Sequence, residues 1–218
     1  MEEIVSSVGT ALRYAGYGLS PLLLLPLLIL AVPKPLKRPS ETLSTLLDRI
    51  SGIAMGFALS AAFLIILIQL AAVLLRYVFG LSFSWLNDSV IFTFAMMFML
   101  GAAATLREDG HVRVDILRPR LSGKTKAGIE LFGSLIFIVP IGILILYAGS
   151  GLIARSWIGL EHFNESDGLP IKYLFKTMVP LFAILMIGQA LSQAIKAALV
   201  IRGLRAPSED SNHSAEAV

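Results

Sequence analysis

Few residues in this chain have the type and spacing that catalysis or metal binding would require. The sequence contains three histidines, His111, His162 and His213, and no cysteine. Without cysteine there is no thiolate nucleophile, no iron–sulfur cluster and no Cys-ligated zinc. His162, Glu165 and Asp167 share one loop, but their spacing is loose for a metal site, and a solvated acidic loop is the better interpretation. The sequence therefore predicts no catalytic residue, no metal site and no bound cofactor.

The composition indicates a membrane protein. The chain has 218 residues, of which 56% are hydrophobic and only 15% are charged, and its mean hydropathy is +0.79. A soluble domain needs more polar surface than this. The formal net charge of +3 and the lack of a basic stripe with interleaved aromatic residues predict no nucleic-acid partner. Long apolar runs exclude an outer-membrane barrel, whose strands are shorter and alternate in polarity.

Four apolar runs are long enough to cross a bilayer, whose hydrocarbon core takes about 20 helical residues. The fold class we predict is therefore an all-α integral membrane bundle. The four spans lie at residues 50–75, 89–106, 131–154 and 177–195. The second has no charge between Ser89 and Leu106, and Pro140 is expected to distort the third.

The N-terminal apolar segment at residues 16–33 has three competing interpretations. It is a cleaved signal peptide, a fifth spanning helix or a re-entrant anchor; a retained membrane segment is favoured because the basic n-region and the cleavage site are poor. The prolines at positions 33, 35 and 39 predict a rigid connector with no continuous helix. Residues 1–44 thus form an N-terminal region, 45–205 the four-helix domain and 206–218 a disordered cytoplasmic tail.

Small residues recur every fourth position in the first secure span, at Gly52, Gly56 and Ser60. Such a stripe lets another helix approach closely in lipid, where packing replaces the hydrophobic effect. Chance spacing in an Ala/Gly-rich helix is the competing interpretation. We predict that this face packs against a helix.

The distribution of lysine and arginine predicts the orientation. The basic segments are residues 34–49, 107–126 and 196–205, and they alternate along the chain with segments that carry fewer bases. The basic segments should face the cytoplasm, which places the C-terminus there. At the opposite interface, Trp85 fits an aromatic belt and Asp88, in the first helical turn, favours the positive end of the helix dipole.

No Asp, Glu, Lys or Arg lies at mid-depth in any of the four spans. Proton relays and ion-coupled substrate sites normally place such residues in the membrane or use broken, repeated helices. The chain alone is therefore expected to catalyse and transport nothing. Two rivals are an anchor subunit of a redox complex, which would need an intramembrane cofactor ligand, and a small self-sufficient homo-oligomeric transporter.

Residues 76–115 contain four local motifs. They are Arg76-Tyr77, Trp85 with Asp88, Gly101-Ala102-Ala103, and the run from His111 to Asp115. With these motifs the chain resembles the small membrane subunit of tripartite ATP-independent periplasmic (TRAP) transporters, the DctQ-like family. The resemblance extends over about residues 45–202. The family usually has an acidic pair after its Trp, where this chain has Asn87 and Asp88.

The resemblance implies a scaffold subunit in the cytoplasmic membrane of a bacterium or archaeon. Its implied partners are a large permease subunit and a periplasmic substrate-binding protein, with surrounding membrane lipid. Any sodium site would lie in the large subunit, and the cargo would be an organic acid. The candidate partner contacts, for which membrane anchoring is the alternative, are Arg76, Trp85, Asp88, Arg107, His111 and Asp115.

Overall fold

The computed structural model describes residues 24–108, 110, 121–163 and 167–206, and over these ranges every regular element is a helix. Four helical rods are long and apolar enough to cross a membrane, which confirms the predicted all-α bundle with four spans. The α5, η2 and α6 helices join end to end into the third rod. The elements are α2 (Leu25–Ala31), α3 (Pro33–Phe79), α4 (Ser84–Arg107), α5 (Gly123–Gly133), η2 (Ser134–Ile138), α6 (Val139–Ile158) and α7 (Lys172–Ile201).

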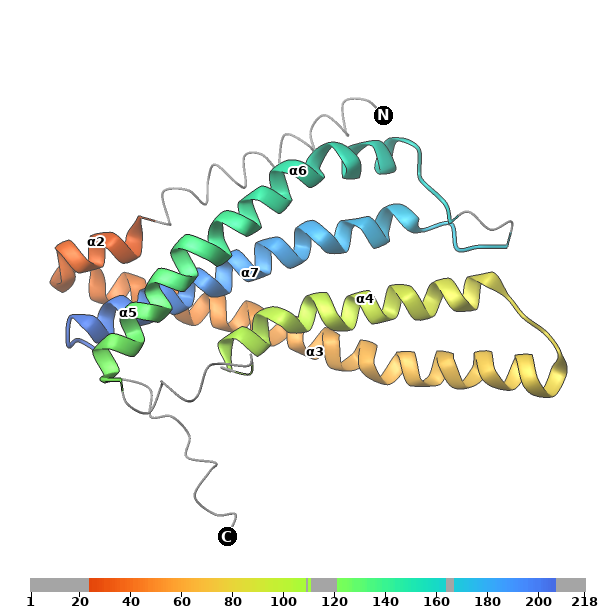
Figure 1. Cartoon of the computed structure of the whole chain (residues 1–218), viewed down its shortest axis with the longest axis horizontal. Helices are drawn as coiled ribbons and strands as arrows, with labels where there is room; N and C mark the ends of the chain where they lie inside the picture. Colours follow the sequence, from red (N-terminus) through yellow and green to blue (C-terminus); the bar gives the residue numbers. More distant parts are fainter. Residues whose placement is uncertain (1–23, 109, 111–120, 164–166, 207–218) are drawn as a thin grey trace, which may run out of the picture.

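The last helix, α7, lies at the centre of the bundle (Figure 1) and packs against every other described helix. Its second half, QALSQAIKAALV, combines alanines with a few large aliphatic side chains. Small residues let neighbouring backbones approach, and in lipid this close packing is the main attraction between helices. Ile187, Ala190, Ala194 and Ile195 are consequently fully buried.

α6 and α7 pack tightly against each other at Gly142. A Cβ built at this position would lie 2.5 Å from Cγ1 and 2.9 Å from Cδ1 of the buried Ile187. We expect Gly142→Ala to destabilise the chain by about 1.5 kcal/mol because a well-packed core tolerates added volume poorly. Equilibrium unfolding in mixed micelles measures this, and Gly151→Ala is the matched control, since a Cβ there meets nothing within 4 Å. An equal effect of both substitutions would contradict the packing described.

The third rod contains a five-residue π-helical turn, Ser134–Ile138, immediately before Val139 and Pro140. Proline has no N–H to donate to the preceding turn, and local widening is one way that a helix accommodates this loss. The predicted distortion near Pro140 therefore takes the form of a π turn within a continuous rod.

The prediction that prolines interrupt the helix before the first span is wrong, because α3 runs unbroken from Pro33 to Phe79. Pro33 and Pro35 lie in the first turn, where a helix N–H has no internal partner and proline costs little. Pro39 removes one hydrogen bond, but the next residue, Ser40, donates its hydroxyl to Leu36 O at 2.5 Å and to Lys37 O at 3.0 Å. The predicted domain boundary at 44/45 falls inside this helix.

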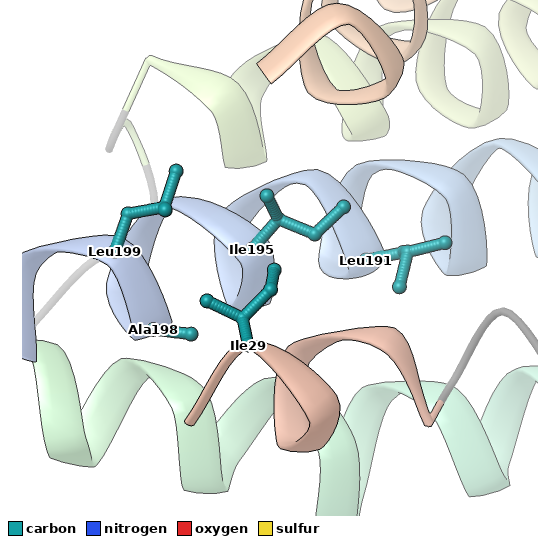
Figure 2. Close-up of a cluster of buried hydrophobic side chains, with 5 residues drawn as sticks. All are labelled: Ile29, Leu191, Ile195, Ala198 and Leu199. Carbon is teal, nitrogen blue, oxygen red and sulfur yellow. The ribbon is translucent and has the colours of Figure 1, made fainter. Parts of the chain in front are cut away.

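The described part of the N-terminal apolar segment forms the short helix α2, which lies against α7 (Figure 2). Ile29 is fully buried and points toward Leu191, Ile195 and Leu199 of α7. Leu36, Leu43 and Leu47 of α3 pack against the same cluster. This packing also explains why α3 stays helical past Pro39. Residues 16–23 lie outside the described ranges, so the choice among a signal peptide, a fifth span and a re-entrant anchor stays a prediction.

The predicted basic segments gather at one end of the bundle. The starts of α3 and α5 and the ends of α4 and α7 lie toward the left of Figure 1, whereas the α3–α4 and α6–α7 connections lie toward the right. The first of these connections follows Gly80, which ends α3 with a φ of 68°, a left-handed conformation that favours glycine. Most of the lysines and arginines that the structure describes therefore lie at one end of the bundle. We call this end of the bundle the basic end, and the end with the α3–α4 and α6–α7 connections the opposite end.

Candidate functional site

A polar network joins α3 to α7 at the basic end, and it is centred on Asp48. The carboxylate of Asp48 is 2.5 Å from Nζ of Lys196 and accepts hydrogen bonds from Ser192 Oγ at 2.7 Å and Gln189 Nε2 at 3.2 Å. Ser51 Oγ in turn donates to Gln189 Oε1 at 2.6 Å. Residues 189, 192 and 196 share one face of α7, and 48 and 51 share one face of α3, because helical neighbours recur three or four residues apart. We call this the Asp48 network.

The C-terminal end of α4 is hydrogen-bonded to α3 and α7 beside the Asp48 network. Arg107 NH1 donates to the backbone oxygen of Asp48 at 2.9 Å, and Gln193 Nε2 donates to the backbone oxygen of Leu106 at 2.5 Å. The last carbonyls of a helix lack partners within it and carry partial negative charge, so both an amide and a guanidinium stabilise this end. Hydrogen bonds and an ion pair thereby hold α3, α4 and α7 together at the basic end.

The Asp48 network has the properties of a structural clamp. Asp48 and Lys196 are each about one-quarter exposed (25% and 24%), and Gln189 and Ser192 are almost fully buried. Every buried side-chain nitrogen and oxygen in the described residues has a hydrogen-bond partner, so the buried polar atoms of the network are satisfied within the chain. No group of three His, Cys, Asp or Glu residues able to hold a metal occurs among the described residues.

At the opposite end, two carboxylates fasten the connection between α6 and α7 to the start of α4. We call this connection, together with the last turn of α6 and the first residue of α7, the 155–172 loop. Asp88 Oδ2 accepts from the backbone N–H of Leu169 at 3.0 Å, and Asp167 Oδ2 accepts from the N–H of Ser84 at 2.9 Å. Ser84 begins α4, so Asp167 satisfies one of the free N–H groups of that helix from a distant loop. This N–H lowers the pKa of the Asp167 carboxyl. We call this pair of contacts the loop clasp.

The position of Asp88 in α4 differs from the sequence prediction. It is the fifth residue of α4, whose first turn contains no acid. The helix begins earlier than expected, at Ser84, so Asp88 lies beyond the turn where the dipole acts most strongly. Its side chain is instead buried, with the residue 8% exposed, against the loop that contains Leu169.

Glu161 joins α6 to α7 near the loop clasp. Its carboxylate forms ion pairs with Lys176 and, at 3.0 Å, with Lys172, and it accepts from Ser156 Oγ at 2.7 Å. These contacts, that of Lys176 first, lower the pKa of Glu161 to about 2. Close by, Trp157 Nε1 donates to Thr177 Oγ1 at 2.9 Å, which fixes the last turn of α6 against α7.

The depressed pKa of Glu161 predicts a pH dependence of stability. Ionised Glu161 contributes fully above its ordinary pKa of 4.5, and the contribution is lost as the pH falls through about 2. The difference in thermal midpoint between the parent chain and Glu161→Gln should therefore be constant from pH 8 to about 5 and shrink below about 4.5. Thermal unfolding in detergent at each pH measures it. A difference that grew on acidification would contradict the ion pairs.

Comparison with known families identifies the chain. Residues 65–199, more than half of its length, match the family model described as "Tripartite ATP-independent periplasmic transporters, DctQ component". The chain belongs to this family. The match covers about the last third of α3, all of α4, α5, η2 and α6, and α7 to Leu199. Comparisons with curated proteins and with solved structures gave no match.

Family membership confirms the resemblance predicted from residues 76–115 and makes this DctQ component a multi-pass inner-membrane subunit of a transporter. The matched region begins about twenty residues later than the resemblance, at 65 rather than 45. The Asp48 network thus combines Asp48 and Ser51, which lie before the matched region, with Gln189, Ser192 and Lys196 inside it.

The three residues of the small-residue stripe in this DctQ component have different surroundings in the fold. Gly52 faces α4, and a Cβ there would lie 3.0 Å from Arg107 NH1. Gly56 and Ser60 are exposed, and a Cβ at Gly56 would meet nothing within 4 Å. The face of α3 that packs inside the chain carries Ser51, Ala54, Ala58 and Ala61 instead. The predicted packing at Gly56 and Ser60 therefore remains a prediction, and it requires a helix from another chain.

Of the other predicted contact residues, those that the structure describes lie at the two ends of the bundle. Arg76 NH2 donates to Ser82 Oγ at 3.0 Å within the α3–α4 connection, and Trp85 is 42% exposed beside Phe83. Arg107 belongs to the interhelical contacts at the basic end. His111 and Asp115 lie outside the described residues, as does Glu165 of the rejected metal site.

Proposed function

We propose that this DctQ component is a non-catalytic scaffold that braces a large, elevator-type permease subunit. The observation that carries the proposal is where the charged groups lie. The apolar stretches at residues 50–75, 89–106, 131–154 and 177–195 contain no charged residue. The partly buried pair Asp48–Lys196 lies just outside two of these stretches and joins two helices of this chain. A subunit that binds a charged substrate or a coupling ion itself would normally place ionisable groups or broken helices at mid-depth.

The exposed face of α3 is our candidate for the contact with the large subunit. Within its most apolar stretch only 11% of residues are buried inside the chain, compared with 39% for α7. Lipid can cover such a face, but Gly56 and Ser60 supply the smooth surface that a closely packed helix needs. In this proposal α3 is the bracing helix and α7 holds the other helices to it.

The opposite end of the bundle is the side that we assign to the periplasm, with the basic end and the C-terminus in the cytoplasm. Exposed Trp85 and the 155–172 loop would then face the periplasmic binding protein, with the loop clasp holding this surface in one shape. The cargo that we propose is an organic acid. Coupling to sodium, in this proposal, takes place in the large subunit.

Copurification tests the assignment. When the large permease subunit carries the affinity tag, this chain should be retained in mild detergent. Gly56→Leu should reduce the retained fraction strongly because its side chain would project from the α3 face. Gly151→Leu on α6 is the matched control, since a Cβ at either glycine meets nothing within 4 Å of this chain. Retention that neither substitution alters would refute α3 as the contact, and failure of the parent chain to copurify would refute the scaffold.

A further inference from the structure

A small pocket at the basic end has a positively charged rim. It encloses about 220 Å³ between the ends of α4 and α7 and the start of α5. Arg107, Lys196 and Arg205 line it, together with one acid, Glu130. Three cations against one carboxylate make this an anion-attracting environment.

The pocket lies at the level where the spans end. Arg107 is the last residue of α4, Gly123 is the first residue of the third span, and Arg205 follows α7 by four residues. Residues at span ends lie among lipid headgroups. Its inner wall is apolar, formed by Ala127, Ala197 and Val200. A cationic rim over an apolar wall, at headgroup depth, matches the two parts of a phospholipid.

The three cations differ in the ionic and hydrogen-bonded partners that they already have within the chain. Lys196 is paired with Asp48, and Arg107 donates to Glu108 Oε1 at 2.7 Å as well as to the backbone of Asp48. Arg205 is exposed and has no hydrogen-bonded or ionic partner among the described residues. Of the three cations, Arg205 is therefore the one with no other partner in the described part of the chain, and Arg107 and Lys196 are held in place beside it.

We propose that this pocket binds the phosphate headgroup of an anionic phospholipid from the adjoining leaflet. Basic pockets between membrane helices on the cytoplasmic side are suited to such headgroups. A volume of about 220 Å³ is below the ~300–1,000 Å³ of sites that enclose a whole drug-sized ligand. The size fits a phosphate group with part of its glycerol.

Native mass spectrometry of the full chain, titrated with phosphatidylglycerol in a neutral detergent, tests the proposal. Arg205→Gln should weaken binding of the first lipid about fivefold, the effect of about 1 kcal/mol per basic residue near a membrane surface. Arg202→Gln is the matched control, because Arg202 is also exposed at the end of α7 but does not line the pocket. The control should bind the lipid as the parent chain does.

Two further titrations distinguish an anionic lipid from a neutral lipid and from free inorganic phosphate. Phosphatidylcholine should bind more weakly than phosphatidylglycerol, and millimolar inorganic phosphate should not displace the bound lipid. Equal loss in the Arg205 and Arg202 variants, or displacement by inorganic phosphate, would overturn the assignment. So would release of the lipid when a partner subunit binds, because the pocket would then belong to a protein contact.

Discussion

Lys196→Ala is expected to destabilise the folded chain by about 3 kcal/mol. Removing one member of a buried ion pair leaves the other charge without compensation, at a cost of roughly 3–5 kcal/mol. The lower figure applies because both side chains are about one-quarter exposed, so water screens Asp48 in part. Equilibrium unfolding in mixed micelles measures the difference. Arg49→Ala is the control: Arg49 is the exposed neighbour of Asp48 and should change stability by less than about 0.5 kcal/mol.

A second substitution separates lost charge pairing from lost packing. Adding Asp48→Asn to Lys196→Ala removes the uncompensated charge, while the new amide oxygen can still accept from Ser192 and Gln189. The double variant should therefore recover about half of the lost stability. If it were no more stable than Lys196→Ala alone, the Asp48 network would not be held together by its charges.

Ile195→Ala is expected to cost about 2 kcal/mol. Ile195 lies on α7 and is fully buried where this helix packs against α2, in the cluster drawn in Figure 2. In a membrane the separated helices still contact lipid, so the transfer part of the usual penalty largely disappears and the cavity part remains. A cavity of about 80 Å³ at about 24 cal/mol per Å³ gives this value.

The same unfolding measurement tests Ile195→Ala. Ile141→Ala is the control for the same change of side chain, because Ile141 lies on the outer face of α6 and is 54% exposed. It should have little effect. Equal losses at the two positions would mean that α2 and α7 do not pack as described.

The number and placement of the spans could be predicted from hydropathy alone. Charged residues bracket each apolar run, and moving a charge into hydrocarbon costs several kcal/mol, so residues such as Arg107 mark where a span ends. The same rule predicted that the basic segments would gather at one end. The family resemblance likewise rested on local motifs, which a single sequence displays directly.

Contacts between distant helices could not be predicted in the same way. Asp48 precedes the apolar run that begins at residue 50, and in the sequence it is one charged residue beside the start of a span. Gln189, Ser192 and Lys196 do recur on one helical face, and that spacing was the available signal, but nothing in α7 indicates that its partner is Asp48. The course of α3 past Pro39 depended likewise on tertiary packing, through Leu36 and Leu43 against α7.

The small-residue stripe shows the same limit. Periodicity grouped Gly52, Gly56 and Ser60 on one face, but a helix can meet two neighbours at different depths. In the fold α4 covers Gly52, while Gly56 and Ser60 remain exposed. Sequence spacing indicates which residues share a face, whereas burial depends on where the neighbouring helix crosses.

Uptake by reconstituted vesicles is the most direct test of the central claim that this chain supports transport without performing it. Proteoliposomes would contain this chain alone, the large permease subunit alone, or both, each with the binding protein and its radiolabelled organic acid outside. We expect uptake above that of empty vesicles only when both membrane subunits are present. Uptake by vesicles that contain this chain without the large subunit would contradict the account.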